Sequence, residues 1–278
     1  MKEEDFDTKF SIIIPTLQKD INILNKLVAE LDVDEYVGEI IIIDNSLKGY
    51  SCDSSKLKVI TPDYNLYVNQ AWNLGIENAK YDLFGILNDD ILLPKNFCKQ
   101  VAEFISKTKN CGLLGLESST SMEYTKDFSK LPKEGKLKFK KIKRLYDNEN
   151  FFWGSAIWGK KDCYFNIPNE MKIYCGDDYL LKCNNKAEKK NYSISGVKVK
   201  HYGRLSSGSE EFSSIKENDQ KFMSTLCPHY KKYYENSLKE ERINTFVENI
   251  FSVRNSEDKK HKVITVLGIK FKRSMRIK

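Results

Sequence analysis

The sequence predicts an α/β protein built on a doubly wound, mostly parallel sheet. Along the first 116 residues, short apolar runs rich in β-branched residues alternate with stretches of helical periodicity. Strands that alternate with helices form parallel sheets covered by helices on both faces. The 278 residues, 40% of them hydrophobic, suffice for a sizeable core, and no apolar run is long enough for a membrane-spanning helix.

The elements of this sheet follow in order along the chain. Residues 10–14 are expected to form a buried strand that stops at Pro15. A helix then follows Asp20, its expected N-cap, because apolar residues recur there at helical spacing. Further strands are expected at residues 39–43, 57–60 and 81–87, and helices at 68–79 and at 94–107, the latter with Pro94 in its first turn.

Beyond residue 116 the pattern weakens. Residues 117–150 are polar and lysine-rich, as in a long loop or insertion. A strand is expected at 193–199, leading to His201, and charged helix at 212–250. We therefore predict a main α/β domain at 1–210, a helical extension at 211–258 and a basic amphipathic tail at 259–278.

The net charge of +7 is concentrated in two segments. Residues 259–278 contain eight Lys or Arg and no acidic residue. Residues 133–144, which we interpret as a solvated loop, contain seven Lys or Arg and one Glu. The rest is mildly acidic, which argues against a nucleic-acid partner. The seven cysteines include no CxxC pair and the chain starts with a polar segment, so we expect reduced thiols and a cytoplasmic protein.

Polar side chains follow several of the predicted strands. Thr16, Asp44 and the run Asn88-Asp89-Asp90 stand where the strands end, and doubly wound sheets bind ligands beyond the carboxyl ends of their strands. Adjacent carboxylates repel unless a cation lies beside them, and Mg²⁺ or Mn²⁺ on a diphosphate suits them. The alternative is a turn in which an Asp caps the next helix.

A second acidic pair, Asp177-Asp178, follows Gly176 and precedes a helical pattern. A carboxylate there is either a general base for a bound hydroxyl or a helix N-cap. His201 is a ligand candidate, with a structural histidine as the alternative. The apolar run around Trp153 and Trp158 is typical of core more than of a sugar platform.

Together these segments resemble the family 2 glycosyltransferases of the GT-A fold, especially bacterial enzymes that build surface polysaccharide. The resemblance covers residues 10–208 and rests on the order and spacing of FSIIIPT, EIIIIDNS, NLYVNQAWNLGIENA, LFGILNDD, FWGSAIWGKK, GDD and VKHYG. Two positions depart from the family pattern: Asn88 replaces the first acid of an Asp-any-Asp motif, and Trp72 replaces an arginine near the diphosphate, for which Arg204 is a substitute candidate.

The resemblance implies a role for each matching residue. The nucleotide-sugar side comprises Pro15, Thr16, Asp44, Asn65, Ala71, Asn73, Asn88 and Asp89. Asp90 and His201 are the implied metal ligands, Trp153 and Gly154 line the sugar and acceptor pocket, and Asp177 or Asp178 is the base, with Asp178 favoured.

The implied activity is metal-dependent, inverting transfer of a sugar from a nucleotide-diphosphate donor to a hydroxyl of a glycan or lipid-linked glycan. The metal is Mn²⁺ or Mg²⁺, and a UDP-sugar is the favoured donor. One alternative is a metal-independent or retaining transferase on the same fold. The other is a non-catalytic scaffold that binds membrane or nucleic acid.

The basic tail mixes cations with apolar residues, as do segments that lie on anionic bilayers. We therefore expect peripheral attachment to the inner face of the membrane. A solvated tail, or an edge strand formed by the alternating IKFK, is the alternative.

Overall fold

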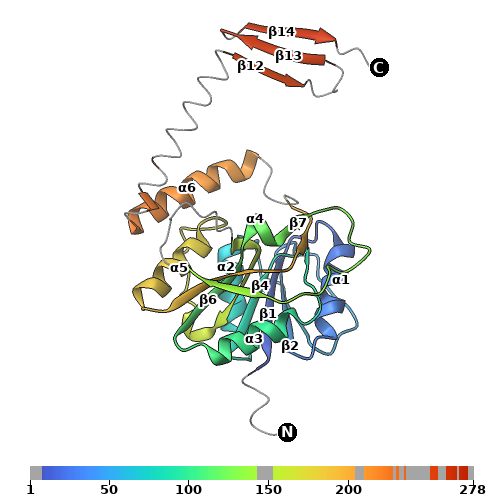
Figure 1. Ribbon diagram of the computed structural model, residues 1–278, viewed down its shortest axis with the longest axis vertical. Coiled ribbons are helices and arrows are strands. Elements are labelled where there is room, and N and C mark those ends of the chain that lie inside the picture. Colours follow the sequence, from blue (N-terminus) through green and yellow to red (C-terminus); the bar gives the residue numbers. More distant parts are fainter. Residues whose placement is uncertain are drawn as a thin grey trace. The chain divides into compact units, whose positions relative to one another are not determined.

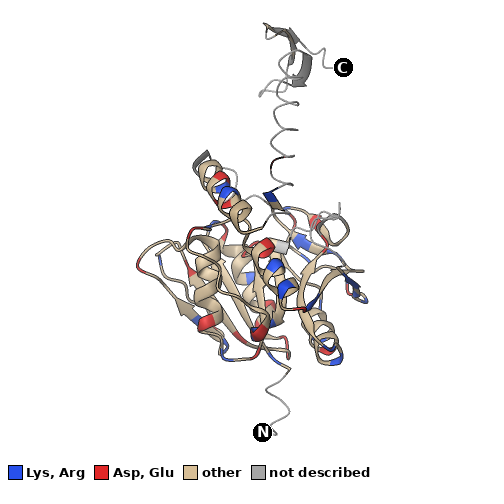
Figure 2. Cartoon of the chain, turned by 90° about the vertical axis from the view of Figure 1, so that its left-hand side faces the viewer, with Lys and Arg blue, Asp and Glu red and all other residues tan. Residues whose placement is uncertain are grey.

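The computed structural model describes residues 8–142, 153–203, 210–227, 230–231, 235, 251–255, 261–267 and 269–274. The chain divides into two compact units, Met1–Leu226 and Cys227–Lys278, and each is described by itself. Figure 2 shows acidic and basic positions interspersed over the first unit. Among the described residues, no helix combines the length and apolar character that crossing a bilayer requires.

The first unit is built on an eight-stranded sheet with the order β3-β2-β1-β4-β9-β6-β10-β8 (Figure 1). Every strand pair is parallel except those made by β8 and β9, which run antiparallel to their neighbours. The strands are β1 (Phe10–Thr16), β2 (Val37–Asp44), β3 (Leu57–Ile60), β4 (Leu83–Leu87), β6 (Cys111–Leu116), β8 (Lys138–Lys141), β9 (Ala156–Lys160) and β10 (Lys190–Ser195). The predicted doubly wound, mostly parallel sheet is confirmed.

Helices cover the sheet and bury alternate residues of its central strands. Ile12 and Ile14 of β1 belong to the core cluster that includes α1 (Ile21–Asp32) and α3 (Phe97–Lys107). Ile13, between them, faces α2 (Tyr67–Glu77), where a Cβ at Gly75 would lie 2.3 Å from its side chain. This alternation is why the strands read as continuous apolar runs. Other α-helices of the described residues include the short α4 (Ser118–Ser121), α5 (Gly176–Lys186) and α6 (Glu210–Leu226).

Two boundaries differ from the sequence prediction. Strand β1 continues through Pro15 to Thr16. Its pairing with β4 ends at Ile13, so Pro15, which has no N–H group, lies where the strand is paired only with β2. Helix α3 begins at Phe97, so Pro94 lies before the helix and not in its first turn. The Asp20 cap is confirmed, with its carboxylate accepting the N–H groups of Asn22 and Ile23.

The basic run 133–144 is not simply a solvated loop. Residues Lys138–Lys141 form the edge strand β8, paired antiparallel with β10. Its alternating pattern turns Phe139 onto Phe104, with ring centroids 3.9 Å apart. The longer segment 117–150 also contains α4 and the strand β7 (Met122–Tyr124), while residues 143–152 lie outside the described part of the chain.

A second, three-stranded sheet orders β5 (Ile91–Leu92), β11 (Val199–His201) and β7. It arises because the strand predicted at 193–199 is two strands, separated by a turn at Gly196 with a φ of +94°. In its register, His201 pairs with Ile91, directly after Asp90. This small sheet therefore brings together two residues that are 111 positions apart in the sequence.

The second unit contains a three-stranded antiparallel sheet formed by β12 (Phe251–Asn255), β13 (His261–Val266) and β14 (Ile269–Ser274). The helical stretch predicted at 212–250 contains α6, which belongs to the first unit, and residues 236–250 lie outside the described part of the chain. In the predicted extension 211–258, Phe251–Asn255 is a strand. The IKFK segment lies in β14, which is an edge strand. This agrees with the alternative interpretation of the tail, in which IKFK forms an edge strand.

Candidate active site

The ends of the central strands bring the first group of predicted residues together. Thr16 at the end of β1 pairs with Asp44 at the end of β2. Thr16 Oγ1 also donates a hydrogen bond of 2.6 Å to Asp89 Oδ2, just after β4. Pro15 pairs with Ile43 beside them. The predicted polar cluster at the carboxyl edge of the sheet is therefore present in the structure.

Asp89 is a largely sequestered carboxyl. Burial raises its pKa to about 6, the hydrogen bond from Thr16 opposes this shift, and the neighbouring charge of Asp90 adds to it. Because Asp89 accepts the hydrogen bond from Thr16, it connects the end of β4 to the end of β1. Asp90 is the carboxylate of this pair that meets His201.

Asp90 and His201 form a buried polar contact. Asp90 Oδ1 lies 3.1 Å from His201 Nε2, and the two residues are 5% and 8% exposed. Asp90 Oδ2 accepts the N–H of Gly203 at 3.1 Å. Asn88 Nδ2 lies 3.4 Å from the same imidazole nitrogen, so all three residues converge.

This arrangement fits a divalent cation. An octahedral ion with bonds of about 2.1 Å places neighbouring ligand atoms about 3 Å apart, and the Asp90–His201 separation matches that spacing. A carboxylate suits Mn²⁺ or Mg²⁺, and an imidazole is a common ligand of divalent metal ions. Within the described ranges, no group of three or more His, Cys, Asp or Glu side chains gathers to hold a metal, so a cation here needs further ligands from a bound molecule or water.

The second acidic pair lies at the start of α5 and is connected to the first. Asp177 Oδ2 accepts the N–H of Gly154 at 3.0 Å, and Asp177 Oδ1 accepts that of Asp178 at 3.0 Å. Next to Gly154, the Ser155 carbonyl accepts the N–H of Asn88 at 2.9 Å. The two clusters are therefore joined through the short helix Trp153–Ser155. The side chain of Trp153 lies outside the described part of the structure.

Asp44 is fully buried and holds its own loop. It accepts the N–H of Ser46 at 3.0 Å, the Ser46 hydroxyl at 2.5 Å and the N–H of Gly49 at 2.8 Å. Burial by itself raises the pKa of Asp44, but hydrogen bonds from Ser46, Gln18 and Gly49 outweigh it and lower the pKa below 3.8. The carboxylate thus shapes the loop after β2.

Three residues predicted to contact the nucleotide lie in α2 or just before it. Asn65 Oδ1 accepts the N–H of Tyr67 at 2.8 Å where the helix begins. Asn73 Nδ2 donates to Gln70 and to the Ile167 carbonyl, while its Oδ1 accepts from Tyr164 and the Ile167 N–H. Ala71 has no exposed surface. The contacts of Asn65, Ala71 and Asn73 with a nucleotide stay predictions.

Sequence reasoning missed three buried polar residues. Asn45 bridges to the start of α2 through the Tyr67 carbonyl and the Leu66 N–H. Asn69 donates to the Tyr174 carbonyl at 3.1 Å. Asp219, on α6, is 1% exposed. The first two lie in the motifs EIIIIDNS and NLYVNQAWNLGIENA, a signal that was available, whereas Asp219 lies in a charged helix without a motif.

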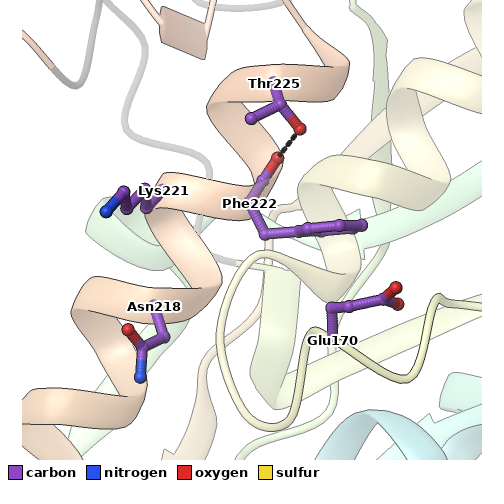
Figure 3. A pocket seen from close by; sticks show the side chains of 5 residues that line it. All are labelled: Glu170, Asn218, Lys221, Phe222 and Thr225. Carbon is purple, nitrogen blue, oxygen red and sulfur yellow. Dashed lines mark hydrogen bonds between the residues drawn. The ribbon is translucent and has the colours of Figure 1, made fainter.

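A shallow hollow lies between α6 and the loop that carries Glu170 (Figure 3). In Figure 3 the ring of Phe222 points from α6 toward this loop. The hollow is lined by Glu170, Asn218, Lys221, Phe222 and Thr225, none of which belongs to the two carboxylate clusters.

Solved structures with a similar fold are glycosyltransferases. S. aureus TarS has a TM-score of 0.52 and 16% identity over 78% of this chain and 40% of its own. The mannosyltransferase PcManGT from Pyrobaculum calidifontis, in complex with GDP-Man and Mn²⁺, has a TM-score of 0.50 and 12% identity over 75% of this chain and 60% of its own. GalNAc-T7 with UDP, GalNAc and Mn²⁺ has a TM-score of 0.51 and 13% identity over 76% of this chain and 48% of its own. The chain thus spans only part of each of these proteins, and at these identities the likeness shows the fold alone.

The family is shown by a match to the sequence itself. No curated protein matches the chain, but the model of "Glycosyl transferase family 2" matches residues 11–165, which is more than half of it. That range contains the strands β1, β2 and β4, whose ends carry the first carboxylate cluster. The protein therefore belongs to glycosyl transferase family 2 and is a glycosyltransferase of the GT-A fold.

Proposed function

We propose that the enzyme moves a sugar from a nucleoside-diphosphate donor to a hydroxyl of a glycan or lipid-linked glycan, with a divalent cation and with inversion. The observation that carries this proposal is the connection between the two carboxylate clusters. Asp90 with His201 borders one side of the site and Asp177 with Asp178 the other, linked through Asn88, Ser155 and Gly154.

The carboxyl edge of the sheet is the proposed donor side. Pro15, Thr16 and the loop shaped by Asp44 would border the nucleoside, and Asn88 the ribose. PcManGT carries GDP-Man and GalNAc-T7 carries UDP, which supports a nucleoside-diphosphate donor on this fold. A UDP-sugar remains our first choice for the donor.

Asp90 and His201 would hold the cation, Mn²⁺ or Mg²⁺. When bound, such an ion neutralises the charge that develops on the departing diphosphate. Mn²⁺ accompanies both PcManGT and GalNAc-T7, which supports this assignment. The residues themselves would orient the diphosphate, because both are buried and fixed by the small sheet of β5, β11 and β7.

We assign Asp178 as the general base. The family resemblance favours Asp178 of the pair, and Asp177 accepts the N–H groups of Gly154 and Asp178. Asp178 would take the proton of the acceptor hydroxyl as its oxygen bonds to the anomeric carbon. The bond from that carbon to the diphosphate breaks on the opposite face, so the configuration inverts. Trp153 and Gly154 would line the acceptor side.

The contact between Asp90 and His201 also favours one alternative. The imidazole already contacts a carboxylate at 3.1 Å. A His201 side chain that donates a hydrogen bond to the diphosphate would serve a metal-independent or retaining transferase on the same fold. The two forms of the reaction differ in their response to chelation.

The test is donor hydrolysis across a panel of UDP-, GDP-, dTDP- and CMP-sugars, each with Mn²⁺, Mg²⁺ or EDTA. We expect one donor class to be hydrolysed and EDTA to abolish the reaction. Full activity in EDTA would support the metal-independent alternative. A panel without hydrolysis, together with no shift in melting temperature by any nucleotide, would contradict the proposed function.

We further propose that the second unit attaches the enzyme to an anionic membrane surface. Val266, Leu267 and Ile269 are 40%, 76% and 62% exposed around the turn between β13 and β14, in the segment that holds eight cations. Exposed apolar residues among cations favour binding to anionic bilayers. We expect the full chain, but not one lacking 259–278, to sediment with vesicles rich in anionic phospholipid. Equal sedimentation of both would contradict the proposal.

A further inference from the structure

The segment ahead of the acidic pair is bonded on both sides. On one side, Asp219 of α6 accepts the N–H groups of Lys172, Ile173 and Tyr174 at 3.0, 2.8 and 2.8 Å. On the other, the Lys172 carbonyl accepts the N–H groups of Val68 and Asn69 at the start of α2. Three consecutive residues are thus held between two helices.

Asn69 adds to the α2 side of this segment. Its side-chain amide donates to the Tyr174 carbonyl at 3.1 Å. Its Oδ1 lies where a Cβ at Gly176 would approach to 2.2 Å, so only glycine fits at the first position of α5. Helix α2 therefore contacts the start of α5 directly, one residue before Asp177.

The turn between the held segment and the acidic pair needs such support. Cys175 has a φ of +63°, in the left-handed region that non-glycine residues rarely adopt. Such a conformation persists only where the surrounding structure imposes it. Because Cys175 follows Tyr174 directly and precedes Gly176, the hydrogen bonds of residues 172–174 set the direction in which α5 begins.

Asp219 is suited to impose this geometry. It is 1% exposed, so its charge has lost water and depends on the three N–H groups. Hydrogen bonds to an ionised acceptor are stronger and shorter than those between neutral groups. A carboxylate offers two acceptor oxygens for these donors, whereas an amide offers one and brings an NH₂ against an N–H.

We propose that Asp219 is a positioning residue that sets the location of the α5 acidic pair in the active site. Helix α6, which the family match of residues 11–165 does not reach, is then part of the catalytic machinery. The inference rests on the proposed function, because it takes a carboxylate of α5 as the base.

The first experiment is Asp219→Asn, with Glu217→Gln as the matched control at an exposed position of the same helix. We expect kcat to fall roughly 10- to 100-fold, as for a small displacement of a catalytic group. Donor KM and nucleotide affinity should stay within about twofold of wild type, because the donor side lies on strands β1, β2 and β4. Asp219→Glu, which keeps both oxygens, should recover part of the loss, and Glu217→Gln should lose nothing.

A double-mutant cycle with the base separates this inference from the proposed function. If Asp219 acts through Asp178, then Asp219→Asn costs little further activity once Asp178 is Asn. A full additional loss in that background would overturn the inference, as would an unchanged kcat for Asp219→Asn. Wild-type activity of both Asp178→Asn and Asp177→Asn would instead refute the base assignment, and the inference with it.

Asn69→Ala serves where Asp219→Asn fails to bind nucleotide and has thus lost its fold. It loosens the same segment from the α2 side and removes a side chain without adding bulk. We expect the same pattern, a lower kcat with unchanged nucleotide affinity. Unchanged kcat in a folded Asn69→Ala would contradict the role of the held segment.

Discussion

The two sides of the active site are built in different ways. On the proposed donor side, Thr16 and His201 stand at strand ends fixed by the registers of two sheets, and Asp90 directly precedes β5. On the proposed base side, Asp177 and Asp178 begin a helix after a left-handed turn, and hydrogen bonds from side chains to the backbone hold the segment before that turn. Strand register cannot shift by less than a residue, whereas a hydrogen-bonded loop adjusts in small steps. We therefore expect donor binding to be robust and catalysis to be sensitive to remote changes.

The largest effect is expected from Asp178→Asn. Loss of a general base lowers kcat roughly 10²- to 10⁴-fold, while the affinity for nucleotide should stay unchanged because the strand ends are untouched. Single-turnover transfer and calorimetric titration of the nucleotide measure the two quantities. Asp177→Asn is the matched variant, with a smaller expected loss because Asp177 is engaged by two N–H groups. A fall in nucleotide affinity with Asp178→Asn would show that the two sides are not separable.

Asp90→Asn should give the next largest effect and the opposite pattern. It removes a charged ligand while keeping the shape of the side chain, so both nucleotide affinity and the response to Mn²⁺ should decline. We expect kcat/KM to fall roughly 100-fold, as for loss of several kcal/mol of charge stabilisation. Titration of Mn²⁺ against activity measures this, with the exposed Glu35→Gln as control. An unchanged Mn²⁺ response would favour the metal-independent alternative.

The same contrast explains what the sequence could predict. Runs such as those of β1, β2 and β4 are continuous and apolar because both faces of the sheet are covered. The ends of these strands can therefore be predicted from the sequence. The residues that follow them lie close together because the carboxyl ends of parallel strands meet at one edge of the sheet. Thr16, Asp44 and Asn88–Asp90 were located by this reasoning. The hydrogen bonds of Asn73 with Gln70, Tyr164 and Ile167 could not be predicted, because a motif gives the position of an amide but not its hydrogen-bond partners.

The structure around Asp177 and Asp178 was harder to predict from the sequence, for a physical reason. The left-handed Cys175 is not glycine, so no residue type marks the turn. Asp219 forms its bonds with residues 45 to 47 positions away, and in a charged helix one more carboxylate carries no signal. Strand β8 was hidden similarly, because its lysines are typical of a loop and only Phe139 packs inward.

The smallest predicted effect tests whether burial makes the donor side rigid. Asp44 and Asp127 form the same local motif, each accepting the hydroxyl and N–H of a serine two residues on. Asp44 is fully buried and Asp127 is exposed. Ser46→Ala should lower the free energy of unfolding by about 1.5 kcal/mol, the low end for one lost hydrogen bond to a charged group, and Ser129→Ala should lower it by less.

The pH dependence of this difference follows from the lowered pKa of Asp44. A carboxyl whose pKa is depressed by folding stabilises the protein above its unfolded value, 3.8, and loses that contribution as the pH falls through the folded pKa. The difference in free energy of unfolding between wild type and Ser46→Ala should thus be largest at pH 7 and become smaller as the pH falls. Denaturant unfolding across this pH range measures it. Equal losses for Ser46→Ala and Ser129→Ala would mean that burial adds nothing, and the donor side would then owe its rigidity to strand register alone.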